Sequence, residues 1–157
     1  MLPMFTSMRD FDSWLASFRP SIADYKYYTD FNKVFNNVDA IKIPLNILNS
    51  LIGSKNIEED FKKILTQYPE TLNCIPILLA KREFDIMAMD EEGQIDFHFD
   101  KPNCTNEEYV KFMRKTGLFD LMENHIVNNL VDYVTGIETG LDSNGRKNRG
   151  GHLMENL

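Results

Sequence analysis

The sequence lacks the features that would assign it to an exported or membrane class. It has only two cysteines in 157 residues, Cys74 and Cys104. Two cysteines make no disulfide framework, so we expect two reduced thiols in a cytoplasmic protein. No apolar run reaches the roughly 18 residues of a membrane-spanning helix. The start, Met1 to Arg9, has no basic segment followed by an apolar stretch, so no signal peptide is expected.

Metal and nucleotide motifs are also missing. The three histidines, His98, His125 and His152, lie far apart, and none has the spacing of a zinc ligand pair. The sequence contains no P-loop and no G-x-G-x-x-G dinucleotide fingerprint. We therefore expect no structural metal in this chain, and we expect His98 to face solvent.

Positive charge is scarce, but it is unevenly distributed. The net charge is −7, which is unusual for a nucleic-acid binder because such proteins normally carry a basic surface. Residues 141–157 nevertheless carry +1, from Arg146, Lys147 and Arg149 against two acids, so the rest of the chain carries −8. Total charge is therefore a weak guide to partners here.

Apolar residues recur at helical spacing along most of the chain. Pro44 suits the first turn of one helix, and Gly53 ends it. Asn56 and Thr105 are expected N-caps, the second in a capping box with Glu108. The pattern predicts helices over 7–18, 21–38, 44–52, 57–68, 70–80, 105–114 and 119–134.

The period changes from helical to alternating at one place. Apolar residues occupy every second position in 94–100, which predicts a half-buried strand, with 84–89 as its partner and 90–93 as the turn. The expected fold is mainly α with a small antiparallel β-hairpin. We expect a helical N-terminal domain over 1–140, with the hairpin at about 84–99, and the start of a second region over 141–157.

Many nucleases hold Mg²⁺ with carboxylates, one of which is followed two residues later by a lysine on the same face of a strand. Two such triples occur, Asp24-Tyr25-Lys26 and Asp60-Phe61-Lys62, and both fall in expected helices, where the acid and the lysine diverge. The expected strands supply acids without a following lysine; these acids are Asp85, Asp96 and Asp100. No complete catalytic site is predicted.

The segment from Gly140 to His152 is the most suggestive of ligand contact. It is rich in Asn and Gly, which favour turns, and we expect Asn144 and Asn148 to position such a turn. Arg146, Lys147 and Arg149 can neutralise phosphates, and Arg and Asn can read base edges. The alternative is a flexible, solvated loop.

Several stretches of the chain, in order, resemble the DpnII family of type II restriction endonucleases. The stretches that carry the resemblance are Tyr27–Val34, Asn46–Ile57, Phe119–Leu121, Leu130–Gly136, Asn144–Arg149 and Met154–Asn156. The resemblance implies an enzyme that cleaves unmethylated GATC sites in double-stranded DNA with Mg²⁺, as a homodimer on a palindrome.

Family members are considerably longer than this chain, and the resemblance implies that residues 141–157 are the truncated start of the nuclease-core region. Their catalytic carboxylates follow the segment that matches Asn144–Asn156, so the catalytic residues are expected beyond Leu157 and this chain alone is expected to be inactive, without a metal of its own. Glu155 could match a helix glutamate near such a metal site, although a solvated or structural role fits it as well. Asn144, Arg146, Lys147, Asn148 and Arg149 are the expected DNA-binding residues.

Two other interpretations stay open. The chain could be a stand-alone DNA-binding or protein-interaction module without catalysis, or a nuclease that recovers its missing half from another chain.

Overall fold

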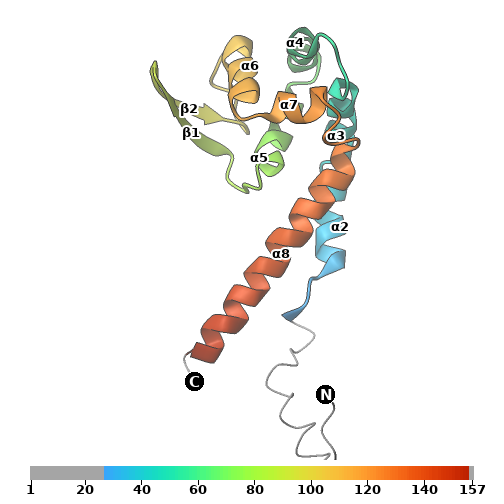
Figure 1. The fold of residues 1–157 in the computed structure, drawn as a ribbon, viewed down its shortest axis with the longest axis vertical. Coiled ribbons are helices and arrows are strands. Elements are labelled where there is room, and N and C mark those ends of the chain that lie inside the picture. Colours follow the sequence, from blue (N-terminus) through green and yellow to red (C-terminus); the bar gives the residue numbers. More distant parts are fainter. Residues whose placement is uncertain (1–26, 156–157) are drawn as a thin grey trace, which may run out of the picture. The chain divides into compact units, whose positions relative to one another are not determined.

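The computed structural model describes the backbone of residues 27–155 and the side chains of residues 27–146. Phe31–Asp142 forms one compact unit, and the described residues 27–30 and 143–155 belong to a second. The helix expected over 7–18 lies outside the described residues. Along the chain the elements are α2 (Phe31–Asp39), α3 (Lys42–Leu48), η3 (Asn49–Leu51), α4 (Ile57–Gln67), η4 (Pro69–Cys74), α5 (Ile75–Leu78), β1 (Asp85–Asp90), β2 (Gly93–His98), α6 (Asn106–Lys115), α7 (Leu118–Glu123) and α8 (Leu130–Glu155) (Figure 1).

The predicted class, mainly α with a small antiparallel hairpin, is therefore confirmed. Both cysteines are free, with Cys74 buried and Cys104 partly exposed. Within the described part of the chain, no helix combines the length and apolar character needed to cross a membrane.

The core of the Phe31–Asp142 unit is built from apolar side chains of its helices and of β2. Its aromatic part joins the hairpin to α6, because the rings of Phe97 and Phe99 lie 4.8 and 5.1 Å from the ring of Phe112. Each such ring contributes roughly 1.5–3 kcal/mol by burial. Its other fully buried large side chains include Leu45, Leu48, Leu51, Phe61, Ile75, Leu78, Phe119, Met122 and Leu130.

The hairpin has the predicted alternation. Asp85 pairs with His98 and Asp90 with Gly93, which leaves Glu91 and Glu92 as the turn. Apolar residues such as Phe97 face the core, whereas His98 lies on the opposite, solvent-facing side, as expected. The side chain of Asn103 bonds to the backbone of β2 on the edge that does not pair with β1. Its Oδ1 accepts from the His98 N–H at 2.9 Å, and its Nδ2 donates to the Asp96 carbonyl at 2.7 Å.

Several predicted helix boundaries are confirmed. Pro44 lies in the first turn of α3, and Gly53 follows η3 with φ +74°. Thr105 forms the predicted capping box with Glu108 at the start of α6. Gly117, with φ +84°, separates α6 from α7.

Other boundaries differ from the predictions. Of the helix expected over 21–38, residues 21–26 lie outside the described residues, 27–30 are not α-helical, and α2 begins at Phe31; Asp30 is of a type that favours N-caps. Asn56 precedes α4 but makes no side-chain cap bond. The Ser54 hydroxyl instead accepts from the Asn56 N–H and donates to Asp60. The helix expected over 70–80 is mostly 3-10, and Pro76 lies in the first turn of the short α5.

The helix expected over 119–134 is two helices. His125 has φ +53°, so the chain leaves the helical conformation after α7. The Asn129 side chain then accepts from the N–H groups of Val131 and Asp132, and the Asn49 side chain accepts from the N–H of Leu130 at 2.8 Å. These asparagines satisfy the free N–H groups at the start of α8.

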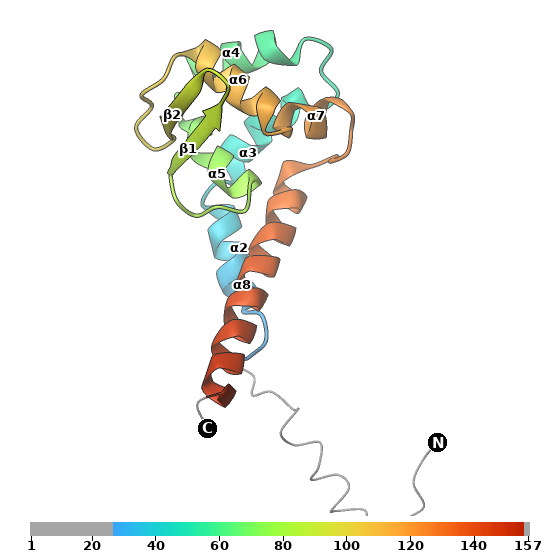
Figure 2. The same cartoon turned by 60° about the vertical axis from the view of Figure 1, so that its left-hand side comes forward.

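The glycine-rich segment after 135 is helical and not the expected turn. α8 continues to Glu155, although Gly136, Gly140 and Gly145 lie within it (Figure 2). Each glycine costs about 1 kcal/mol relative to alanine in a helix. Packing offsets this cost, because α8 buries one residue per turn: Leu130, Val134, Glu138 and Asp142.

Candidate nucleic-acid interface

The expected DNA-contact residues, Asn144, Arg146, Lys147, Asn148 and Arg149, lie on the C-terminal part of α8. Asn144 and Asn148 therefore have helical backbone, and the interpretation that they hold a left-handed turn is wrong. A helix is a more rigid frame for these positions than a solvated loop.

Helical spacing divides the five positions into two groups. At about 100° per residue, positions 144, 147 and 148 occupy one side of α8, and positions 146 and 149 the opposite side. The two arginines are thus grouped with each other and separated from Lys147. This separation could not be read from a segment interpreted as a turn.

Two contacts connect the start of this segment to residues 27–30 of the same unit. The hydroxyls of Thr29 and Ser143 are hydrogen-bonded. Arg146, whose side chain is 18% exposed, lies with Nη2 3.8 Å from Oδ2 of Asp30. Asn144 is exposed. Sequence reasoning missed Asp30, because nothing local in the sequence connects it to a residue more than 100 positions later.

The D-x-K triple on α4 does not form a metal site. Asp60 accepts a hydrogen bond from Ser54 at 2.6 Å, whereas Lys62 forms ion pairs with Glu59 and Glu107. The triple lies on a helix, as predicted, but Asp60 and Lys62 are only partly exposed. The triple Asp24-Tyr25-Lys26 lies outside the described residues.

The strand acids gather around a histidine on the outer face of the hairpin. Asp85 is hydrogen-bonded to Nδ1 of His98, and Oδ2 of Asp96 lies 3.6 Å from Nε2. The bond to Asp85 raises the pKa of His98. Asp100 is exposed in the turn that follows β2.

Across the described side chains, no group of three or more acids, histidines or cysteines is arranged to hold a metal ion. Glu155 is the last helical residue of α8, and its side chain lies outside the described ones.

Comparison with known proteins identifies relatives over nearly the whole chain. The family model described as DpnII restriction endonuclease matches residues 10–157. The type II restriction enzyme DpnII of Streptococcus pneumoniae is 55% identical over 95% of this chain and 52% of its own length. MjaIII of Methanocaldococcus jannaschii is 42% identical over 94% of this chain and 53% of its own length. MboI of Moraxella bovis is 37% identical over 92% of this chain and 51% of its own length.

The chain thus spans about half the length of these curated relatives, all of which are type II restriction enzymes by name. No solved structure matches it. The family match over residues 10–157 and the identities of 37–55% leave one assignment: the chain belongs to the DpnII restriction endonuclease family.

Proposed function

We propose that this chain is the DNA-binding, helical N-terminal part of a type II restriction endonuclease that cleaves double-stranded DNA at unmethylated GATC sites. The observation that carries the proposal is the segment Asn144–Arg149. It places three cations and two amides on a single helix of a family member whose net charge is −7. Arg and Lys neutralise phosphates, and amide side chains can pair with base edges.

The helical geometry suggests how the contacts are shared. A helix in the major groove has phosphate walls on both sides. Arg146, which is 18% exposed beside Asp30, must exchange that carboxylate for a phosphate before positions 146 and 149 can approach one strand, while Lys147 approaches the other. Asn144 and Asn148 lie on the Lys147 side, one turn apart, where they can add polar contacts. A homodimer would repeat this arrangement on a palindromic site.

Our proposal assigns cleavage to residues beyond this chain, which covers 52% of the DpnII relative's length. Mg²⁺ there would stabilise the developing negative charge and help to form hydroxide. The acids described here support that division, because Asp60 is bonded to Ser54 and Asp85 to His98.

Salt-dependent DNA binding tests the proposal. Replacing Arg146, Lys147 and Arg149 with Ala should weaken binding to a GATC duplex and lower the slope of log affinity against log salt by about 0.9 per lost phosphate contact. Fluorescence anisotropy between about 50 and 300 mM salt measures both quantities. The matched control is Lys101→Ala, an exposed lysine outside α8, which should leave both unchanged.

Two narrower variants test the division of the helix. Lys147→Ala should lower the salt slope by the amount expected for about one phosphate contact. The double variant Arg146→Ala with Arg149→Ala should lower it by the amount for about two. The proposal is wrong if the triple variant, folded by circular dichroism, binds the duplex as tightly as the original chain at every salt concentration.

A further inference from the structure

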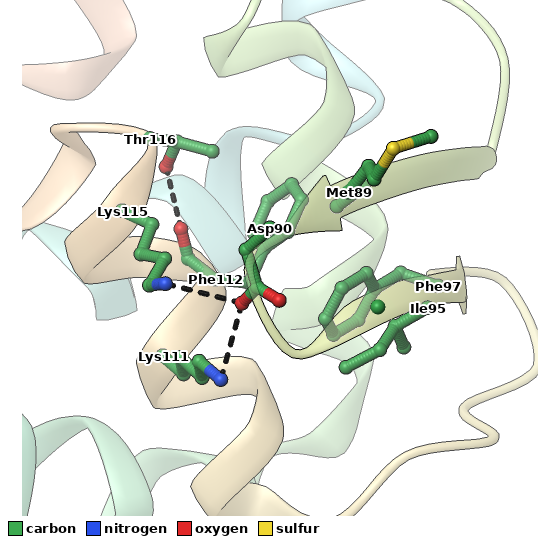
Figure 3. A pocket seen from close by; sticks show the side chains of 10 residues that line it. Met89, Asp90, Ile95, Phe97, Lys111, Phe112, Lys115 and Thr116 are labelled. Atoms are coloured by element: carbon green, nitrogen blue, oxygen red, sulfur yellow. Dashed lines mark hydrogen bonds and ion pairs between the residues drawn. The ribbon is translucent and has the colours of Figure 1, made fainter.

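A pocket of about 240 Å³ lies between the hairpin and α6, within the Phe31–Asp142 unit (Figure 3). One wall comes from the hairpin near its turn, and the other from the last two turns of α6. The lining residues are Ala88, Met89, Asp90, Gly93, Ile95, Phe97, Lys111, Phe112, Lys115 and Thr116.

The apolar part of the pocket is held by the core. The rings of Phe97 and Phe112 lie 4.8 Å apart, and both also contact Phe99. Phe97 and Phe112 are buried, so their rings cannot turn away to fill the space. The pocket is therefore preformed, and Ala88 and Ile95, beside the small accessible part of the two rings, give it apolar walls for a small ring.

The charged part consists of two lysines and the carboxylates that they contact. Lys111 and Lys115 lie one turn apart on α6, and their Nζ atoms lie 3.2 and 3.1 Å from Oδ2 of Asp90 (Figure 3). Glu92, 81% exposed on the turn, also pairs with Lys111, at 2.7 Å. The ionised lining residues, two lysines and Asp90, sum to +1, and Glu92 beside Lys111 brings the local sum to zero.

Lys115 is the cation that a ligand can reach. Its side chain is 56% exposed, and its carboxylate partner, Asp90, is shared with Lys111. Both lysines hold the pKa of Asp90 down at about 2, so Asp90 stays charged and fixes both ammonium groups at the pocket. An ammonium group has three donors, so Lys115 can keep its bond to Asp90 and donate to a second anion.

We propose that this pocket binds a small aromatic anion, whose ring rests on Phe97 and Phe112 and whose phosphate or carboxylate accepts from Lys115. The volume suits a single ring with one anionic substituent, at the small end of ligand sites. Affinity for such a small molecule should be about millimolar. The lining shares no residue with the α8 segment, and the proposal does not depend on DNA binding.

Titration of the isotope-labelled chain by NMR tests this inference with phenyl phosphate and benzoate as probes. Both should shift amide signals in 88–97 and 111–116, and both should saturate. Inorganic phosphate, which lacks the ring, and benzyl alcohol, which lacks the charge, should bind at least about tenfold more weakly.

Two variants remove one half of the site each. Lys115→Met keeps the apolar stem and removes the charge, whereas Ala88→Leu keeps both lysines and fills the pocket. Each variant should bind phenyl phosphate at least about tenfold more weakly than the original chain does. Lys63→Met, an exposed lysine on α4, is the control and should bind as the original chain does. Retained binding by either folded pocket variant, or failure of both probes to shift these signals, overturns the proposal.

Discussion

Gly53 is constrained twice, by its own backbone and by a neighbour from a distant part of the chain. Its φ is +74°, a conformation that side chains other than glycine rarely adopt. A Cβ at this position would lie 2.5 Å from Nε2 and 2.7 Å from Cε1 of His125. The N–H of Gly53 also donates to the Met122 carbonyl at 3.0 Å, which fixes the turn after η3 against the end of α7.

Gly53→Ala should therefore lower the free energy of unfolding by about 2–4 kcal/mol, since backbone strain and overpacking add. Urea denaturation measures the change. Gly136→Ala is the matched control: Gly136 is helical with nothing near its would-be Cβ, so alanine should raise stability by about 1 kcal/mol. Adding His125→Ala to Gly53→Ala should recover only the part of the lost stability that comes from the clash with the His125 ring. A Gly53→Ala chain as stable as the original would refute both constraints.

His98 lies between two carboxylates on the outer face of the hairpin. The hydrogen bond to Asp85, with added attraction from Asp96 and Asp100, raises its pKa above 6.5. Folding therefore favours the protonated form. The resulting stability is fully present below about pH 6.5, the unfolded value, and is lost as pH rises through the folded value.

The thermal midpoint should accordingly fall by a small amount between about pH 6 and pH 8.5. Asp85→Asn should remove most of this dependence, because Asp85 is the largest cause of the shift. His98→Gln serves as the control, since it cannot titrate. A midpoint that rises over this range, or an equal fall in His98→Gln, would contradict the assignment.

At the scale of elements, the buried carboxylate of Glu138 connects α8 to α2 and to the segment before β1. Glu138, whose side chain is only 7% exposed, accepts two hydrogen bonds from the Arg82 guanidinium, at 3.0 and 3.3 Å, and one from Nδ2 of Asn37. Such a pair, with two parallel bonds, fixes orientation as well as distance. It sets how the N-terminal half of α8 packs in the Phe31–Asp142 unit.

Removing only Arg82 should leave Glu138 without its cation. We expect Arg82→Met to cost about 2 kcal/mol, less than the 3–5 kcal/mol of a fully buried pair because half of Arg82 is exposed. Glu138→Gln keeps the bond to Asn37 and should cost less than Glu138→Ala. Chemical denaturation gives these values. Equal stability of Arg82→Met and the original chain would show that the pair adds nothing.

Elements whose boundaries depend on residues nearby in the sequence were predictable. Elements whose boundaries depend on side chains far away in the sequence were not. The hairpin and α6 follow from alternation and from the Thr105 capping box, whose partners lie within a few residues. The start of α8 depends on the Asn49 side chain, 81 positions away, and no local pattern encodes that bond. The glycines within α8 favour a turn locally, but the buried stripe that ends at Asp142 outweighs them.

The same contrast holds for the candidate site of the whole molecule. The cluster of Arg146, Lys147 and Arg149 is visible in the sequence because it opposes the charge of the remaining chain. Its division into two sides is not, since this requires the helix. The pocket beside α6 was missed as well, because Asp90 and Lys115 meet only when the hairpin packs on α6.

At the scale of the molecule, DNA binding and DNA cleavage should separate. Incubated with Mg²⁺ and an unmethylated GATC duplex, with protein in excess of sites, the chain alone should bind without cutting. Cleavage requires a metal held by carboxylates beside a group that activates water. Asp85 and Asp96 on the strands, and Asp100 in the turn after β2, are followed two residues later by Met, His and Pro, and not by the lysine that such sites use. On α4, Asp60 and Lys62 have separate partners.

Denaturing gels of end-labelled duplex measure this outcome, with a full-length family enzyme as the positive control and a duplex lacking GATC as the control for contaminating nuclease. Cleavage confined to GATC would contradict the prediction that the chain binds without cutting, provided that the chain itself is the nuclease. Two variants decide whether the chain itself cuts: the double variant Asp85→Asn with Asp96→Asn, and the single variant Glu155→Gln. Loss of cutting in either variant would place catalytic carboxylates within these 157 residues. Unchanged cutting in both would instead indicate a co-purifying enzyme.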